Sequence, residues 1–425
     1  MNQHARRNKM TTDWRPVAYG LCVAWQAIVV APPAAGGESR SADGWQVLFD
    51  VETLKGWQPV FENGSLSVRE GTIVVGDAVT NHLLVYFKNN RQKPHPNHGP
   101  AVSVVVGNLL PEEGGLAKTN PSPLSSPFGV DFDSRGNMVI IELAGGRIHR
   151  RNTTGKLSLV AGDGTADYTG DGGPASNATF NGMHNVAVTP NDDIYIADSW
   201  NHCIRKIDGK TGIITTIAGT GQAGDSGDGG SAKLATFNFV MCITLNATND
   251  RLFVADLRNR RIRAVDLKQG TVHRIAGNGS KGVPEDGAVA VDSPLVDPRA
   301  VAVDSKDQVY ILERGGHALR VVTPDGKIRT VAGTGQKGYR DGPALQAQLS
   351  SPKHLCVDAE DNVIIADDQN RAIRKFDAKD RTLTTILGRG IGTPPVQLNR
   401  PHGVCIEQGK LYVVDTANDR ILRLD

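Results

Sequence analysis

The composition describes a folded protein that is rich in turns. Glycine makes up about 11% of the 425 residues, against a usual share near 7%, and glycine plus proline about 16%, below the ~25–30% of low-complexity chains. Hydrophobic residues, at 39%, are sufficient to build a core. The formal net charge is +2, and residues 1–35 alone carry +3, so the rest of the chain carries −1. Because a nucleic-acid-binding domain is normally strongly basic, we expect no nucleic-acid partner.

The N-terminus has the layout of a secretory signal peptide. Basic residues up to Arg15 precede an apolar stretch, Val17–Ala31, and small residues follow it. The stretch holds about 15 residues, fewer than the roughly 20 that span a bilayer, which favours a signal peptide over an uncleaved membrane anchor. We predict a signal peptide over residues 1–35, a secreted or periplasmic location, and no stable membrane insertion after cleavage.

Residues 36–100 are predicted to form an N-terminal extension. Over residues 45–88 the sequence resembles the opening of the 3-keto-disaccharide hydrolase domain, a lectin-like jelly roll. The matching segments are Gly44–Asp50, Leu54–Trp57 and Ser67–Gly76. The match is too short for the whole sandwich, so it implies a partial jelly-roll-like segment and no activity. Residues 89–100 contain three prolines and are expected to be a linker.

Six similar units follow, each beginning with a short apolar run, and they recur at spacings of 49–58 residues. In each unit further β-branched runs follow the first, separated by turns that contain Asp, Asn or Gly. Four such runs predict an antiparallel four-stranded meander. Because one meander cannot bury both of its faces, six copies predict an all-β, six-bladed β-propeller over residues 101–425. The first runs start at Val130, Val186, Ile243, Val301, Leu355 and Val404.

The sixth unit ends after its third run, at Arg420–Asp425, so its fourth strand has to come from elsewhere. The stretch 101–107, with the sequence Ala-Val-Ser-Val-Val-Val-Gly, precedes the first unit. We predict that this stretch completes the last blade and joins the two ends of the ring without a covalent bond. Such closure leaves only short, protected strand edges.

Four cysteines remain once Cys22 is removed with the signal peptide. Cys356 and Cys405 occupy matching positions of successive units, so a disulfide between them is one option in an oxidising compartment. We favour the alternative that these two, like Cys203 and Cys242, are small buried residues on strands.

A polar motif repeats between the second and third runs, as Asp-x-x-Asn followed by Ile and, in most copies, Arg. It occurs at Asp198 and Asn201, Asp256 and Asn259, Asp367 and Asn370, and Asp415 and Asn418. This pattern resembles the NHL repeat, over about residues 101–425. The first and fourth units depart from it, with Glu142 and Glu313 in place of Asp and Gly145 and Gly316 in place of Asn. We interpret the motif as turn caps, with Arg pairing to a carboxylate, rather than as a functional ring of acids.

Long glycine-rich connections lie between the early units and resemble those of bacterial extracytoplasmic NHL proteins. They lack the Lys-Ser/Thr of a P-loop, so we do not expect them to bind phosphate. Their clustered acids, Asp167, Asp171, Asp225 and Asp228, suggest weak calcium binding as one option. We favour turn formation without a metal.

In a propeller the innermost strands surround a central channel, and the residues just before each first run line one of its mouths. We expect this mouth to bind the ligand, and its cationic side chains suit an acidic peptide or a sugar acid. Histidines that only form hydrogen bonds at a turn are the alternative. The residues expected at the mouth are Phe128, His184, Met241, Arg299, Lys353 and His402.

Two enzymatic alternatives follow from resemblance. Alternate blades contribute His184, Arg299 and His402, which is similar to the channel histidines that hold zinc in the peptidyl-hydroxyglycine amidating lyases. A catalytic zinc takes three protein ligands, whereas Arg299 stays protonated and His354 is offset by one residue from the register. A lactonase similar to the gluconolactonases would need a metal held by carboxylates and Asn in the channel, and the acids here fall on the turn motif instead.

We therefore interpret the protein as an extracytoplasmic NHL-type propeller that acts as a noncatalytic binding scaffold for protein, peptide or glycan ligands. A metal-dependent lyase or lactonase/hydrolase with its site in the central channel is the alternative. The scaffold needs no cofactor, whereas the enzyme would use zinc or calcium.

Overall fold

The computed structural model describes residues 99–109 and 123–425 in full, and the backbone of five short N-terminal strands. The chain divides into two compact units, Met1–Asn97 and His98–Asp425. The first unit contains a sheet of order β1-β5-β2 and a hairpin β3-β4. These strands are β1 (Ile28–Val30), β2 (Trp57–Val60), β3 (Ser65–Arg69), β4 (Thr72–Gly76) and β5 (Leu83–Asn89). The rest of the predicted signal peptide, jelly-roll-like segment and linker lies outside the described residues, and these assignments stay predictions.

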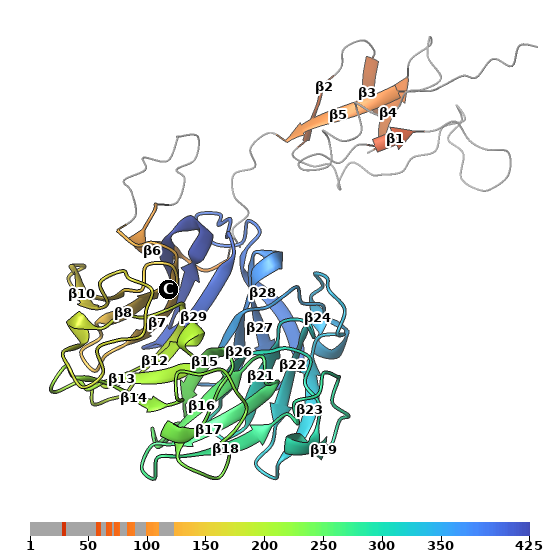
Figure 1. Cartoon of the computed structure of the whole chain (residues 1–425). Helices are drawn as coiled ribbons and strands as arrows, with labels where there is room; N and C mark the ends of the chain where they lie inside the picture. The colour runs from red at the N-terminus through yellow and green to blue at the C-terminus, as the bar shows by residue number, and fades with distance from the viewer. Residues whose placement is uncertain are drawn as a thin grey trace, which may run out of the picture. The chain divides into compact units, whose positions relative to one another are not determined.

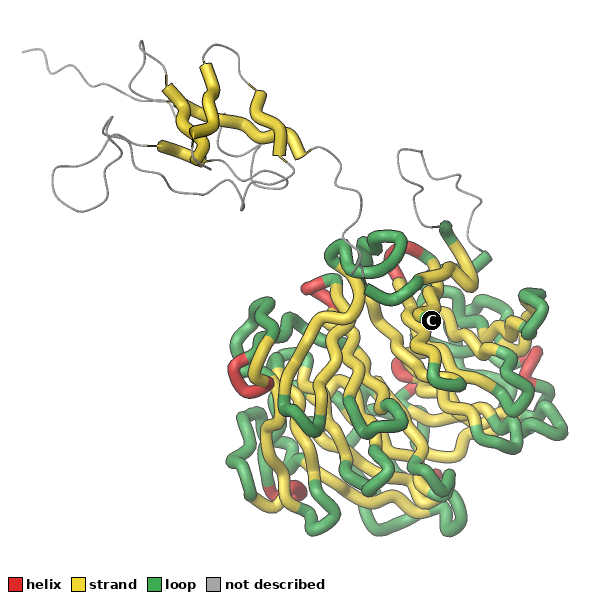
Figure 2. Tube along the Cα trace, turned by 180° about the vertical axis from the view of Figure 1, so that it is seen from behind, coloured by secondary structure: helices red, strands yellow, loops and turns green. Residues whose placement is uncertain are grey.

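The second unit is an all-β propeller of six blades, each built on four antiparallel strands (Figures 1 and 2). This confirms the fold that the repeat spacing predicts. Blade 1 is β7 (Pro127–Phe132), β8 (Met138–Glu142), β9 (Ile148–Arg151) and β10 (Leu157–Ala161). Blade 2 is β11 (Met183–Val188), β12 (Ile194–Asp198), β13 (Cys203–Ile207) and β14 (Ile214–Ala218). Blade 3 is β15 (Val240–Leu245), β16 (Arg251–Asp256), β17 (Arg261–Asp266) and β18 (Thr271–Ala276).

Blades 4 and 5 each gain a two-residue strand at the outer edge, β19 (Ala288–Val289) and β24 (Gly342–Pro343). Blade 4 is β20 (Pro298–Val303), β21 (Val309–Glu313), β22 (Ala318–Val322) and β23 (Lys327–Ala332). Blade 5 is β25 (His354–Val357), β26 (Val363–Asp367), β27 (Ala372–Asp377) and β28 (Thr382–Gly388). Blade 6 is β29 (Pro401–Glu407), β30 (Lys410–Asp415), β31 (Arg420–Leu424) and β6 (Val102–Gly107).

The helical elements of the described chain are all short 3₁₀ turns in the connections. They are η1 (Ala175–Asn177), η2 (Ser199–Asn201), η3 (Ala232–Leu234), η4 (Ala290–Asp292), η5 (Ala344–Gln346), η6 (Asp368–Asn370) and η7 (Thr416–Asn418). Within the residues described, no helix has the length and apolar character that a membrane span requires.

The sixth sheet combines strands from both ends of the propeller. β6 pairs antiparallel with β31, so that Val106 lies opposite Ile421 and Val102 opposite Leu424. Both valines are buried, and Val106 packs in an apolar cluster with residues of blades 6 and 1. How far this strand stabilises the closed ring stays a prediction, which a deletion tests below.

The hydrophobic core lies between neighbouring blades. Phe180 is fully buried between blades 1 and 2, and Phe237 between blades 2 and 3. Further clusters join blades 3, 4 and 5, blades 5 and 6, and blades 6 and 1. Each sheet is therefore covered on both faces, which a single meander cannot achieve by itself.

Candidate functional site

The expected mouth residues lie at the start of the inner strands, most of them on β-bulges. In β11 the register with β12 shifts between Met183 and Asn185, which leaves His184 unpaired. The inner strands β7, β15, β20 and β29 shift at the same position. A bulge re-aims the unpaired side chain. The bulged residues are Phe128, His184, Met241, Arg299 and His402, and Lys353 directly precedes β25.

These side chains converge from different blades onto one ring. Phe128 lies 4.9 Å from His184 and 4.3 Å from His402, measured between ring centroids. The Arg299 guanidinium carbon is 5.9 Å from the Phe128 centroid, and Arg299 Nη1 donates to the Met241 carbonyl at 3.3 Å. Blades 1 and 4, which supply Phe128 and Arg299, stand opposite each other in a ring of six. Arg299 thus reaches across the channel.

Arg299 is a buried cation that forms no ion pair within 4 Å with a carboxylate of the described residues, although Asp297 and Asp368 act on it from a greater distance. The residue is 2% exposed, and within the described chain its Nε has no hydrogen-bond partner. Burial and the nearby Arg314 lower the pKa of Arg299 to about 10, which leaves it charged at neutral pH. A buried charge without a counter-charge opposes folding. Packing alone therefore does not explain this residue.

The two histidines of the mouth contribute no positive charge. Burial, together with Arg299, lowers the pKa of His184 to about 3 and that of His402 to about 2. His184 Nδ1 donates to the Gly182 carbonyl at 2.7 Å, whereas neither ring nitrogen of the buried His402 has a hydrogen-bond partner among the described residues. The cationic character expected from the sequence therefore comes from Arg299 and Lys353.

Asp368 is the acid that lies beside Lys353, and it is not among the residues expected from the sequence. Its carboxylate lies 3.7 Å from Lys353 Nζ and 3.8 Å from His402 Nε2. Both separations are too long for hydrogen bonds, and Asp368 Oδ1 has no hydrogen-bond partner in the described chain. Burial and Arg299 lower the pKa of Lys353 to about 8, although Asp368 opposes this shift.

Below the mouth, a second layer of residues narrows the channel. Its members each pair with the adjoining strand just after the bulge position, and they are Gly129, Asn185, Cys242, Ala300, His354 and Gly403. His354 has the largest side chain of the layer. Its Nε2 accepts a hydrogen bond from Asn185 Nδ2 at 2.9 Å, from blade 5 to blade 2 across the ring. The one-residue offset of His354 expected from the sequence is confirmed.

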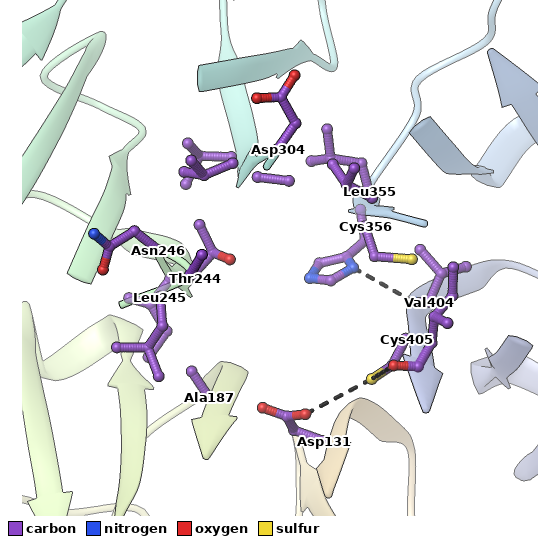
Figure 3. Close-up of a pocket in the computed structure, with 18 of the residues that line it drawn as sticks. Asp131, Ala187, Thr244, Leu245, Asn246, Asp304, Leu355, Cys356, Val404 and Cys405 are labelled. Atoms are coloured by element: carbon purple, nitrogen blue, oxygen red, sulfur yellow. Dashed lines mark hydrogen bonds between the residues drawn. The ribbon is translucent and has the colours of Figure 1, made fainter. Parts of the chain in front are cut away.

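The far end of the channel opens into a cavity of about 460 Å³ (Figure 3). Cys405 contacts Asp131 there at 3.7 Å, and burial raises the pKa of Asp131 to about 6. Asp131 Oδ2 accepts the Val188 N–H at 2.7 Å. The other aspartates that line this cavity also accept hydrogen bonds from the protein, and they are Asp304, Asp358 and Asp361. Polar groups at this end are therefore satisfied internally, unlike those at the mouth.

The Asp-x-x-Asn turns position the mouth. Asp198 Oδ1 accepts the backbone N–H of Asn181, two residues before β11, and its Oδ2 accepts from Asn201. Asp256, Asp367 and Asp415 make the same pair of contacts in their blades. The interpretation of the motif as a turn cap is confirmed, since each carboxylate ties the approach to an inner strand to the same blade.

Blades 1 and 4 use a longer acid for the same purpose. Glu142 accepts the Ser125 N–H at 2.7 Å, and Glu313 accepts the Val296 N–H at 2.5 Å. A Cβ on Gly145 would come within 2.1 Å of Glu142 Oε2, and one on Gly316 within 2.7 Å of Glu313 Oε2. Glycine replaces Asn in these two units because the longer side chain occupies the space.

Buried arginines on the third strands of blades 2, 3 and 5 bind aspartates of the glycine-rich connections, and we call these three contacts the latches. Arg205 pairs with Asp171 at 2.8 Å, Arg263 with Asp228 at 2.8 Å, and Arg374 with Asp341 at 2.6 Å. Asp225 pairs with Arg261. These contacts favour the structural interpretation of the loop acids over calcium binding. Within the described ranges, no three His, Cys, Asp or Glu side chains are placed to hold a metal ion.

The four cysteines of the described chain are free thiols on strands. Cys203 and Cys242 are buried, whereas Cys356 and Cys405 are partly exposed. Burial raises the pKa of Cys242 to about 11, and it also raises the pKa of the other three thiols above the ordinary value.

Two features beside the mouth were not expected from the sequence. Trp200 is 45% exposed, and its ring lies 6.4 Å from that of His184. A Cβ on Gly182 would come within 2.3 Å of the indole, so glycine lets the ring lie against the backbone. The second feature is a cavity of about 540 Å³ beside His184 and Met241. Its charged lining residues are Arg258, Arg260, Lys281, Arg314 and Asp297.

This side cavity is cationic with apolar walls. Asp297 accepts from Arg314 Nε at 2.8 Å, so its one carboxylate is already paired. The Arg258 guanidinium lies 3.8 Å from the centroid of Phe239. Aromatic residues between the motif's Asp and Asn, as at Trp200, are the signal that could have drawn attention to this rim.

Comparisons with known proteins agree with this architecture. The NHL repeat family profile matches residues 180–207 and 398–424. NHL repeat-containing protein 2 of Gallus gallus is 29% identical over 349 residues, which cover 72% of this chain and 47% of that protein. The chain thus spans about half the length of the curated relatives it matches first.

Solved structures share the fold at low sequence identity. An auxiliary nutrient binding protein from Bacteroides ovatus superposes with a TM-score of 0.56 at 13% identity, covering 85% of this chain and 88% of that one. A gluconolactonase from Xanthomonas campestris gives a TM-score of 0.50 at 10% identity, over 76% and 88% of the two chains. At these identities the likeness shows the fold alone. The chain is therefore a six-bladed β-propeller that carries NHL repeats in blades 2 and 6.

Proposed function

We propose that this propeller is an extracytoplasmic, noncatalytic scaffold that binds a protein, peptide or glycan ligand at the mouth formed by Phe128, His184, Met241, Arg299, Lys353 and His402. The propeller supplies a rigid frame, and bulges present one side chain from each of blades 1, 2, 3, 4 and 6, while blade 5 contributes Lys353. Function on such a fold has to be argued from the site, because propellers host many activities.

The observation that carries the proposal is the isolation of Arg299. A buried guanidinium normally has hydrogen-bonding partners for most of its N–H groups. Arg299 has one hydrogen bond within the described chain, to a carbonyl at 3.3 Å. Asp297 and Asp368 act on Arg299 only from a distance, so a ligand group at the mouth would provide the direct ion pair that Arg299 lacks within the described chain.

One protein of similar structure also supports a binding role. The Bacteroides ovatus protein is described as an auxiliary nutrient binding protein. A scaffold that captures a ligand outside the cytoplasm would also use the signal peptide predicted for residues 1–35. The extracytoplasmic location and the class of ligand are both part of what we propose.

Glycan and peptide arrays probed with the labelled full chain test this proposal. We expect retention of a defined subset of ligands, lost in Arg299→Met and kept in Arg251→Met, since Arg251 is exposed. Retention that is identical in both variants would place the binding site elsewhere and overturn the proposal. Stoichiometric zinc or calcium in the purified protein, lost in His184→Ala and His402→Ala, would favour a metal-dependent enzyme instead.

A further inference from the structure

We propose that the mouth selects acidic oligosaccharides, with a sugar carboxylate neutralising Arg299 and Lys353 and a sugar ring resting on Trp200. This inference depends on the proposed function, because it names the ligand class of the same site.

The charge balance of the mouth favours an anion. Arg299 and Lys353 stand at the starts of the inner strands of the neighbouring blades 4 and 5, and the presence of Arg299 makes protonation of Lys353 less favourable. Asp297 is paired with Arg314, and the three contacts of Asp368 to surrounding cations or His402 are all 3.7 Å or longer. The latch arginines, by contrast, each have a carboxylate within hydrogen-bonding distance. A carboxylate from outside would give Arg299 the partner that the others already have.

The hydrogen-bonding groups around this charge favour hydroxyls. Asp368 Oδ1 is an unpartnered buried acceptor, and neutral His402 has one donor and one acceptor nitrogen, both without partners in the described chain. A hydroxyl donates and accepts, whereas a peptide N–H only donates and a peptide carbonyl only accepts. A sugar acid carries a carboxylate and several hydroxyls on one ring, so it can satisfy both kinds of group.

The rim suits a ligand longer than one sugar. Trp200 presents an exposed indole beside His184, and the apolar C–H face of a pyranose can pack on such a ring. His184 also borders the side cavity of about 540 Å³, whose basic residues outnumber its single, already paired acid. Further carboxylates along an acidic oligosaccharide would meet these cations.

Titration calorimetry of the full chain with trigalacturonate tests the inference, with neutral galactotriose and triglutamate as matched ligands. Chelator is present throughout, so that no adventitious metal bridges sugar and protein. We expect trigalacturonate to bind at least about 10-fold more tightly than galactotriose, and added salt to weaken binding. Arg299→Met should reduce the affinity about 10- to 100-fold, as loss of a charged hydrogen bond does, and Arg251→Met should not.

Trp200→Ala provides a second variant, and because the indole is exposed this change should leave the fold intact. It should weaken trigalacturonate binding without affecting any residual binding of triglutamate. The inference would be overturned if galactotriose bound as tightly as trigalacturonate, or if Arg299→Met left the affinity for trigalacturonate unchanged. If triglutamate bound more tightly than trigalacturonate and its binding also depended on Arg299, the ligand would be an acidic peptide rather than a sugar. That result would overturn this inference and leave the proposed scaffold function in place. Absence of binding by all three ligands would overturn this inference alone, since the arrays test a wider range of ligands.

Discussion

Buried arginines occur in two regions of this propeller and have opposite surroundings. At the latch of blade 5, Arg374 donates to Asp341, to Asp367 and to the carbonyls of Arg340 and Gln348. At the mouth, Arg299 donates to one carbonyl within the described chain. Both residues are almost completely buried. The difference teaches that burial of a charge does not reveal its role, whereas its partners do.

The physical consequence is a difference in what each arginine does for folding. Besides its loop carboxylate, a latch arginine lies within 4 Å of the fully buried motif aspartate of its blade, so its removal leaves that buried carboxylate without its cation. Removal of the mouth arginine takes away a charge that lacks compensation. The first residue should therefore be essential for stability, and the second dispensable for stability but needed for ligand binding.

Breaking the ring is the most severe way to test this comparison, because both regions depend on closed packing between blades. Deletion of residues 101–107 removes the partner of β31 and two buried valines, Val102 and Val106. Burial of the two valines alone is worth about 3–6 kcal/mol. We expect a large fall in the thermal unfolding midpoint, measured by circular dichroism, and loss of ligand binding.

Ser103→Ala is the control for this deletion, since the Ser103 hydroxyl has no hydrogen-bond partner in the described chain. It should leave the midpoint unchanged. An unchanged midpoint in the deletion variant would show that the pairing of β6 with β31 does not hold the ring closed.

Removing one latch should have the next largest effect. Arg374→Met leaves Asp367 fully buried without the cation that lies 2.8 Å away. Breaking a buried ion pair from one side typically costs about 3–5 kcal/mol. We expect a decrease of this size in the free energy of unfolding, measured by urea denaturation. Lys375→Met is a matched control on the same strand, because its ion pair with Asp358 is partly exposed and worth at most about 1 kcal/mol. Equal effects of the two substitutions would remove the distinction between latch and surface pairs.

Arg299→Met, at the mouth, should not lower the free energy of unfolding as Arg374→Met does. Methionine keeps the length of the side chain and removes a charge that has no counter-charge, so we expect the free energy of unfolding to stay the same or to rise by up to about 2 kcal/mol. The same urea measurement compares it with Arg374→Met. If Arg299→Met lowered the free energy of unfolding by more than about 2 kcal/mol, Arg299 would have a structural role, and the mouth and the latches would not differ in the way described.

The blades and the mouth could be predicted from the sequence because both depend on local, repeated signals. Four β-branched runs per unit specify a meander, and the mouth residues stand at a constant offset before the first apolar run of each unit, which puts five of the six at the start of the inner strands. Partner choice could not be predicted in this way. Arg205 meets Asp171, 34 residues away, only once the glycine-rich connection has folded back on its blade.

Contacts across the ring were also beyond the reach of the repeat pattern. His354 was recognised as one residue out of register, but its hydrogen bond to Asn185 spans 169 residues of sequence and depends on the small residues elsewhere in the second layer. Asp368 stands next to a motif acid, where other blades carry Ser199, Leu257 or Thr416. That extra acid in one turn was the available signal for its place at the mouth.

The remaining expected effect concerns pH and the second cation of the mouth. In the folded protein, burial and Arg299 lower the pKa of Lys353 to about 8, from an ordinary value of 10.5. Between these values the unfolded chain binds the proton more tightly than the folded chain, so the free energy of unfolding should rise with pH. Arg299, Arg314, Arg400 and Asp368 are the charged groups that act on this lysine, and Arg299, with a pKa of about 10, begins to lose its own charge only at the upper end of the interval. Urea unfolding of the full chain and of Lys353→Met from pH 7 to pH 10 checks this, since the difference between the two curves isolates Lys353 from the other titrating groups. A difference that is flat with pH, or that falls, would mean that the lysine is not confined beside Arg299, and the mouth would then hold one buried cation rather than two.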